Sequence, residues 1–117
     1  MNGDDKKNNT NKQKSARTAE QEYGLSKQAI RDIKSTLAKY PQVTQAILYG
    51  SRAKGNFRAG SDIDLTLKGT ELTLEILCKI ENDLDDLLLP YKIDLSIYSK
   101  ITDQAVLEHI DRVGKIF

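Results

Sequence analysis

The 117-residue chain has little of what marks several specialised classes of protein. It contains one cysteine, two prolines, no tryptophan and only 6% aromatic residues. The single Cys78 cannot form an internal disulfide, which excludes a disulfide-stabilised scaffold and fits a reducing compartment. We expect this free thiol to be buried on the apolar face of a helix. The tyrosines are too scattered along the chain to form a platform for stacking nucleic-acid bases.

An excess of charge of one sign and long hydrophobic runs are also missing. The formal net charge is +1 although 30% of the residues are charged, so the overall field attracts neither nucleic acid nor an anionic membrane. No apolar run approaches the roughly 18 residues of a membrane span, and the N-terminus lacks the hydrophobic segment of a signal peptide. We therefore expect a cytoplasmic protein without membrane contact or direct nucleic-acid binding, whose charged sites are local.

The first segment of the chain, residues 1–22, is rich in Asn, Lys, Asp and Gln and has almost no large apolar side chain. Such a segment cannot bury enough apolar surface to offset the entropy lost on ordering. We predict a disordered polar tail over residues 1–22. The remaining residues, 23–117, are enough for one domain with a modest core.

Hydrophobic periodicity divides this domain into helices and strands. Apolar residues recur every three to four positions in three segments, and they alternate or form a short run in three others. This pattern predicts an α/β fold with a small mixed sheet against which the helices pack. The predicted order is helix 25–41, strand 43–50, strand 61–69, helix 71–90, strand 91–99 and helix 102–117.

Capping signals refine the predicted helices. Ser26 is the expected N-cap of the first helix, which should stop at Pro41. The second helix is expected to carry one apolar stripe from Leu72 to Leu88. Thr102 or Asp103 should cap the last helix.

Two of the predicted strands carry acidic residues on one face. Asp62 and Asp64 alternate with apolar residues, so their side chains point to the same side, about 6.5 Å apart. Two adjacent carboxylates repel each other, and without a counter-charge at least one is pushed towards its protonated form. Asp94 occupies an equivalent position in strand 91–99. A hard divalent cation such as Mg²⁺, which prefers oxygen ligands, would remove the conflict.

The segment before these acids has the features of a phosphate-binding turn. Strand 43–50 ends at Gly50-Ser51, and the residues that follow are compatible with a short helix. Backbone N–H groups, the Ser51 hydroxyl and the side chain of Arg52 or Lys54 could all donate to an anion, and Gly50 lets a phosphate approach the backbone. If the three strands are neighbours, Asp94 completes a three-carboxylate, two-metal cluster beside this turn.

The segment GSRAKGNFRAGSDIDL combines the phosphate-binding turn with the acidic pair, since Gly50-Ser51 is followed by ten residues and then by Asp62-Ile63-Asp64. It resembles the active-site signature of the nucleotidyltransferase superfamily that includes DNA polymerase beta, and most closely that of the minimal nucleotidyltransferases. The resemblance covers residues 26–117 and implies the nucleotidyltransferase fold. The catalytic and metal-binding residues that it implies are Asp62, Asp64 and Asp94. The nucleotide-binding residues are Gly50, Ser51, Arg52, Lys54 and Ser61.

The family resemblance also implies a reaction. A nucleoside monophosphate, commonly AMP from ATP, passes to a hydroxyl with release of pyrophosphate, supported by two Mg²⁺ ions. The chain has no further domain to bind an acceptor, so the acceptor should come from outside. In the minimal group it is often a helical toxin of the HEPN type, modified on a tyrosine hydroxyl by its antitoxin. A homo- or hetero-oligomer is consistent with this interpretation.

Two other functions remain open on sequence grounds. One is a catalytically silent module that keeps the fold to bind a nucleotide or a partner, which the intact set of acids disfavours. The other is a small-molecule nucleotidyltransferase of the aminoglycoside-modifying kind, which the missing acceptor domain disfavours.

Three further polar residues carry weaker signals. His109, the only histidine, is expected to have a surface or half-buried structural role on the last helix. Arg58 could reach a phosphate or the acceptor, or could simply be a solvated loop cation. Ser61 could orient a neighbouring ligand or stabilise a turn.

Overall fold

The structure, a computed structural model, describes residues 21–117, and the rest of the predicted tail lies outside this range. Its central element is a four-stranded sheet with the strand order β5-β4-β3-β6. β3 runs antiparallel to both β4 and β6, whereas β4 and β5 are parallel. The mixed sheet confirms the predicted α/β class. The strands are β3 (Gln45–Tyr49), β4 (Ile63–Lys68), β5 (Ile93–Ile97) and β6 (Lys115–Ile116).

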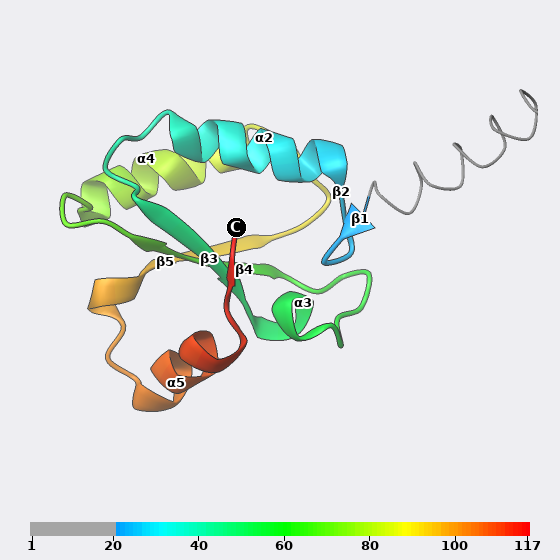
Figure 1. Cartoon of the computed structure of the whole chain (residues 1–117). Coiled ribbons are helices and arrows are strands. Elements are labelled where there is room, and N and C mark those ends of the chain that lie inside the picture. Colours follow the sequence, from blue (N-terminus) through cyan, green and yellow to red (C-terminus); the bar gives the residue numbers. More distant parts are fainter. Residues whose placement is uncertain (1–20) are drawn as a thin grey trace, which may run out of the picture.

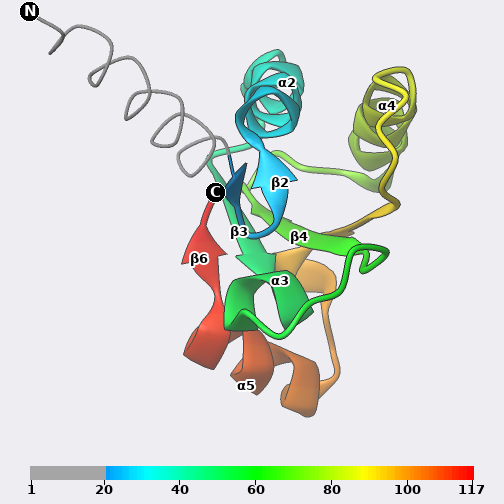
Figure 2. The same cartoon turned by 90° about the vertical axis from the view of Figure 1, so that its right-hand side faces the viewer.

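Helices cover both faces of the sheet (Figure 1, Figure 2). α2 (Lys27–Ala38) and α4 (Leu74–Asp85) lie side by side over one face. The short α3 (Gly50–Lys54) and α5 (Gln104–Val113) lie on the other face. α4 forms the crossover that two parallel strands require, because it carries the chain from the end of β4 back to the start of β5. The 3-10 helix η1 (Tyr98–Lys100) leads from β5 towards α5.

The hydrophobic core lies between the sheet and the α2/α4 layer. Side chains alternate along a strand, so every second residue of β4 enters this layer, and Ile63, Leu65 and Leu67 are fully buried. The alternation expected from the sequence is therefore confirmed. Helices and neighbouring strands supply the other buried members of the cluster: Leu25, Ile30, Ile33, Leu37, Leu48, Leu72, Ile80, Leu84, Leu95 and Ile97.

Side-chain caps fix where the three longer helices begin. Ser26 caps α2, as predicted, by accepting a backbone N–H three residues further on at 3.1 Å. Of the two candidates for α5, Asp103 is the cap and accepts a backbone N–H at 2.9 Å. Thr73 caps α4 in the same way at 3.2 Å. Each bond satisfies a donor that has no partner within the first helical turn.

α4 is shorter than the predicted helix. It ends at Asp85, whereas the apolar stripe was expected to continue to Leu88. Leu88 instead has a φ of 55° and is 87% exposed, so it is not part of the stripe. Leu72 is buried but precedes the helix. The reason lies in the backbone, because a left-handed residue ends a helix and Pro90 disfavours helical geometry in the residue before it.

The prediction of a buried thiol is wrong, since Cys78 is exposed. The buried residues of α4 are Ile80 and Leu84, which are one turn apart and share a face. Cys78 lies two positions before Ile80, about 200° around the helix, and therefore points to the opposite side.

Three short strands were not predicted. β1 (Gln21–Glu22) pairs with β2 (Leu25–Ser26), so the last two residues of the predicted tail belong to a small hairpin. β6 replaces the end of the predicted last helix, which stops at Val113. Strands of two residues are too short to produce a period in the sequence, so periodicity alone does not reveal them.

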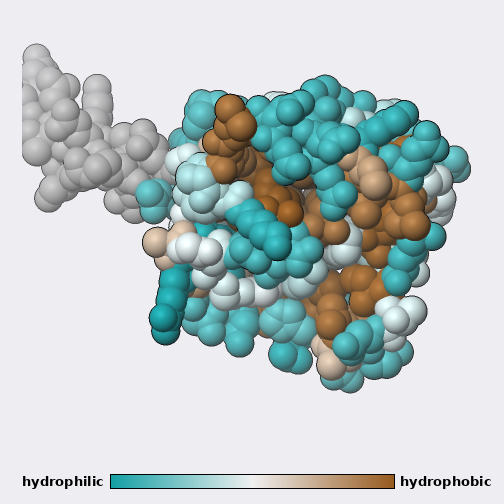
Figure 3. All heavy atoms as spheres, turned by 180° about the vertical axis from the view of Figure 1, so that it is seen from behind, coloured by the Kyte–Doolittle hydropathy of each residue, from teal (hydrophilic) through white to brown (hydrophobic). Residues whose placement is uncertain are grey.

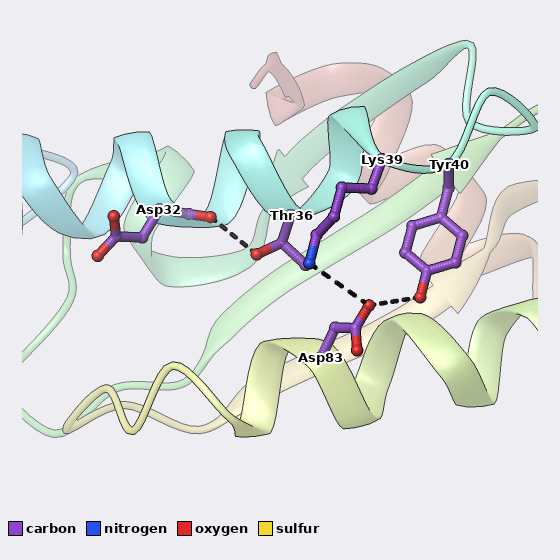
Figure 4. Close-up of polar contacts among 5 residues, drawn as sticks. All are labelled: Asp32, Thr36, Lys39, Tyr40 and Asp83. Carbon is purple, nitrogen blue, oxygen red and sulfur yellow. Dashed lines mark hydrogen bonds and ion pairs between the residues drawn. The ribbon is translucent and has the colours of Figure 1, made fainter.

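A polar contact joins α2 and α4 at one end of the core (Figure 4). The Tyr40 hydroxyl, just beyond α2, donates to Asp83 Oδ2 at 2.5 Å, and Lys39 Nζ lies 3.8 Å from the same oxygen. Thr36, one turn earlier, returns its hydroxyl hydrogen bond to the backbone carbonyl of Asp32. The two contacts of Asp83 therefore link the C-terminal ends of α2 and α4, whereas the Thr36 hydrogen bond lies within α2.

Part of the surface is apolar. Viewed from behind, hydrophobic areas alternate with hydrophilic side chains (Figure 3). In the described part of the chain, the large apolar side chains that are exposed are Leu74, Leu88 and Ile116. None of the helices within residues 21–117 has the length and apolar character to cross a membrane.

Candidate active site

Two of the predicted catalytic acids lie side by side on adjacent strands. Asp64 of β4 is in register with Asp94 of the parallel strand β5. Residues in register on neighbouring strands have their side chains on the same face, with the strands about 4.8 Å apart. On its other side, Asp64 is opposite Tyr49 of β3. Asp62 is exposed immediately before β4 and shares the face of Asp64, because the two are separated by one residue.

The acids interact electrostatically. The pKa of Asp64 is raised above its ordinary value, first because the carboxyl group is partly buried and then because of the negative charges of Asp94 and Asp62. Asp64 is therefore close enough to both neighbouring acids for their charges to raise its pKa. This is the electrostatic repulsion between neighbouring carboxylates that the sequence pattern predicts.

The donor set suits a hard divalent cation in kind and charge. Carboxylates are the protein ligands that Mg²⁺ prefers, and it commonly uses one or two of them together with water and substrate phosphates. Within residues 21–117, no three acidic, histidine or cysteine side chains lie in an arrangement that could hold a metal ion by themselves. The predicted three-carboxylate cluster of Asp62, Asp64 and Asp94 is therefore not found as a ready metal site, and metal binding by these acids together with other oxygen ligands stays a prediction.

Gly50 lies beside one of the acids, Asp64. It follows β3 with a φ of +75°, a backbone conformation that side-chain-bearing residues rarely adopt. A Cβ atom at this position would lie 2.2 Å from Asp64 Oδ2. From the sequence, Gly50 was expected to let a phosphate approach the backbone. The structure adds a second requirement from within the protein, because any side chain would displace the Asp64 carboxylate.

The segment after Gly50 forms α3, as its composition suggested. Ser51 is half-buried at the start of this helix, and Lys54 is exposed at its end. Gly55 then ends the helix in a left-handed conformation, and its N–H donates to the Ser51 carbonyl at 2.8 Å. Ser51 and Lys54 therefore follow Gly50 within one short helix that lies against β3 and β4.

Arg52 has a different environment from the one predicted. Its side chain is 2% exposed, and its guanidinium group lies 5.2 Å from the Phe57 ring centroid and 5.0 Å from that of Tyr91. The guanidinium donates to three backbone carbonyls, those of Tyr23, Ala59 and Ser61. This burial argues against the predicted nucleotide contact. Arg52 instead ties the hairpin and the loop before β4 to the end of the sheet.

Ser61 and Arg58 belong to the loop that Arg52 holds. The Ser61 hydroxyl accepts the backbone N–H of Arg58 at 2.8 Å, which is the turn-stabilising role considered for it. Its predicted contact with nucleotide stays a prediction. Arg58 is exposed, in keeping with a solvated cation.

Polar residues continue along the acidic face of the sheet. The Ser96 hydroxyl of β5 donates to Thr66 Oγ1 of β4 at 2.9 Å. The pKa of Tyr49 is raised mainly by burial, and the charges of Asp64 and Asp94 add to the effect, whereas a hydrogen bond with Ser96 opposes it. The phenol of Tyr49 therefore lies near the acids and stays protonated at neutral pH.

His109 is the functional candidate that sequence reasoning missed. Its Nε2 atom accepts the backbone N–H of Gly50 at 3.1 Å, across 59 residues of sequence. Its ring packs edge-on against Tyr49, with ring centroids 6.2 Å apart. The half-buried position of His109 agrees with the expectation, but its hydrogen bond to the Gly50 N–H, which links α5 to the start of α3, was not expected. Sequence alone carries no signal for it, since the partner is a main-chain group.

A separate hollow of about 380 Å³ lies between α4 and β5. Its lining includes Glu81, Leu84, Tyr91 and Leu95, and none of the predicted site residues belongs to it. The acidic face of the sheet and this hollow are therefore different features of the surface.

Comparisons with known proteins agree with this geometry. A family model described as polymerase beta, nucleotidyltransferase matches residues 31–117. The chain is similar to one from the crystal structure of a toxin-antitoxin with AMP-PNP, with a TM-score of 0.61 and 20% identity over 74% of this chain and 69% of that one. It is also similar to one from the tri-AMPylated Shewanella oneidensis HEPN toxin in complex with MNT antitoxin, with a TM-score of 0.58 and 17% identity over 77% and 69%. At these identities the likeness shows a shared fold. A comparison with curated proteins gives no significant match.

Proposed function

Because the chain belongs to the polymerase beta nucleotidyltransferase family, we propose that it moves AMP from ATP to a hydroxyl group of a partner protein. The observation that carries this proposal is the placement of Asp64 level with Asp94, directly beside the turn at Gly50. Acids that share one face next to a glycine turn suit phosphoryl-group chemistry better than structural stabilisation, because their mutual repulsion opposes folding.

In this proposal the acids and the turn have separate tasks. Asp62, Asp64 and Asp94 hold Mg²⁺, while Gly50, Ser51 and Lys54 bind the triphosphate. When bound, divalent cations supply charge neutralisation on the phosphates and lower the pKa of a hydroxyl group. The acceptor oxygen forms a bond to the α-phosphorus of ATP, and the bond to the pyrophosphate oxygen breaks. Asp94, on the edge strand β5, orients the acceptor hydroxyl and accepts its proton.

A helical toxin of the HEPN type is the proposed acceptor, and the protein would be its cytoplasmic antitoxin. Two features support this choice. The fold is similar to chains from toxin-antitoxin structures, one of which contains an AMPylated HEPN toxin with an MNT antitoxin. The acids also lie towards the edge strand β5, where a separate protein could present a hydroxyl group.

A transfer assay tests the proposal. The protein is incubated with Mg²⁺, ATP labelled on the α-phosphate and a HEPN-type partner, and the labelled species is identified by mass. We expect one or more AMP groups on the partner, and no label when Asp62→Asn replaces the wild type. Asp86→Asn is a matched control, because it removes an exposed acid at the end of α4, away from the acidic face.

The two rival functions give different results in the same assay. A binding module would retain nucleotide without labelling any acceptor. A small-molecule nucleotidyltransferase would label low-mass hydroxyl compounds, such as aminoglycosides, and leave the protein partner unlabelled. Either result contradicts the proposed function.

A further inference from the structure

The backbone N–H of Gly50 has an acceptor supplied from the far end of the fold. Gly50 is the first residue of α3, so its N–H has no carbonyl partner within the helix. His109, near the end of α5, provides the acceptor through Nε2 at 3.1 Å. The histidine thus satisfies one of the unpaired N–H groups of the first turn of α3, where β3 passes into the helix.

The hydrogen bond fixes the chemical state of the imidazole. A ring nitrogen that accepts a hydrogen bond carries no proton, so the neutral imidazole has its proton on Nδ1. The ring cannot turn freely, because it packs edge-on against Tyr49 at an interplanar angle of 77°. Two neighbouring residues therefore hold His109 in place. Tyr49 packs against its ring, and the Gly50 N–H donates to its Nε2 lone pair.

The same peptide controls the geometry of the acids. The Asp64 carboxylate oxygen occupies the space next to Gly50 that a Cβ atom would fill in any other residue. A rotation of the Gly50 peptide would change this approach, and it would also change the direction of Ser51, the next residue. The contact from His109 restrains that rotation at its N–H group.

We propose that His109 is a positioning residue for nucleotide binding, which acts by holding the Gly50 peptide in the orientation that the triphosphate requires. This inference rests on the proposed function, since it assigns a role within that site. It does not place His109 in contact with substrate. α5 thereby becomes part of the nucleotide site, although it contributes none of the residues of the Gly-Ser and Asp-x-Asp pattern.

Two substitutions separate the lone pair from the ring. His109→Gln keeps an acceptor oxygen close to the position of Nε2 and removes the ring. His109→Phe keeps a ring that can pack against Tyr49 and removes the acceptor. Glu108→Gln, an exposed neighbour on α5, is the control. Affinity for AMP-PNP with Mg²⁺ is measured by calorimetry on the full chain, together with the NMR signal of the Gly50 amide and the melting temperature.

We expect His109→Phe to weaken AMP-PNP binding about tenfold, the effect of one lost hydrogen bond, and to move the Gly50 amide signal. His109→Gln should stay within about twofold of the wild type. A purely structural role predicts the opposite order, because the phenylalanine variant would then be the better tolerated. If His109→Phe does not fold, His109→Asn, whose side chain is too short to reach Gly50, replaces it.

Distinct results overturn the inference and the proposed function. Unchanged nucleotide affinity or an unmoved Gly50 signal in His109→Phe, or equal losses in the Gln and Phe variants, overturns the role of His109 and leaves the proposed function standing. A wild type that does not bind AMP-PNP overturns both.

Discussion

The two faces of the sheet differ in composition although they are built from the same strands. In β4, Ile63 and Leu65 are fully buried in the core on the side of α2 and α4, whereas Asp64 and Thr66 alternate with them and point to the other face of the sheet. The negative charges of Asp94 and Asp62 raise the pKa of Asp64, while Leu65, the next residue, belongs to the buried apolar cluster. A strand of alternating residues can therefore carry the stability of the fold on one face and the chemistry on the other. The comparison predicts that substitutions on the two faces have separable effects.

The largest effect should come from the acidic face. Asp64→Asn removes the central carboxylate, and we expect the rate of AMP transfer to fall by about 10⁴-fold. The fold should be retained, because the change removes a charge whose repulsion opposes folding. Transfer is measured with the α-labelled ATP assay, and folding by circular dichroism. Wild-type activity in this variant would remove Asp64 from the site.

Asp94→Asn should separate binding from reaction on that same face. If Asp94 mainly serves the acceptor hydroxyl, affinity for ATP with Mg²⁺ should change little while transfer falls by about 10³-fold. Calorimetry and the transfer assay on one protein preparation give both values. A parallel loss of ATP affinity would instead assign Asp94 to the triphosphate.

Substitutions on the apolar face should lower the stability of the fold. Leu65→Ala leaves a cavity beneath α2 and α4, and we expect the free energy of unfolding to fall by about 3 kcal/mol. Urea denaturation measures this value. At a temperature where the variant is folded, its rate of transfer per folded molecule should match the wild type, and a large loss of that rate would contradict the separation of the two faces.

The smallest predicted effect depends on pH. The raised pKa of Asp64 means that ionising this group costs more in the folded state than in the unfolded one. The metal-free wild type should therefore lose stability as the pH rises from the ordinary carboxyl value of 3.8 through the raised pKa of Asp64. At pH 7 we expect Asp64→Asn to melt roughly 2 °C higher than the wild type, a small shift because solvent screens a partly exposed group. The difference should vanish below pH 3.8.

Melting curves at both pH values, recorded with a chelator, test this sign. Saturating Mg²⁺ together with ATP should reverse the order at pH 7, because ligands that bind only the folded wild type stabilise it. A variant that is less stable than the chelated wild type at neutral pH would show that the acids do not oppose folding.

The difference between the apolar and the acidic face of the sheet could be predicted from the sequence where it depends on a local residue pattern. Alternation over residues 63 to 67 identifies both faces of β4, and the spacing from Gly50 to Asp62 identifies the site through a family resemblance. The pairing of Asp64 with Asp94 follows only when β4 and β5 are parallel and in register, which no local pattern specifies. The contacts of Arg52 and His109 were not predicted, for one shared reason. Their partners are main-chain atoms, which every residue has, so no residue type in the sequence reveals them.

The buried Arg52 has a consequence for the loop before β4. Its guanidinium group contacts that loop through the carbonyls of Ala59 and Ser61, and neither contact involves a side chain of the loop. These two contacts therefore do not depend on the side chains of residues 58 to 60, three exposed positions shortly before Asp62. If the protein acts as proposed, side chains at these positions could be exchanged to suit a different acceptor protein while Arg52 keeps its contacts with the loop backbone.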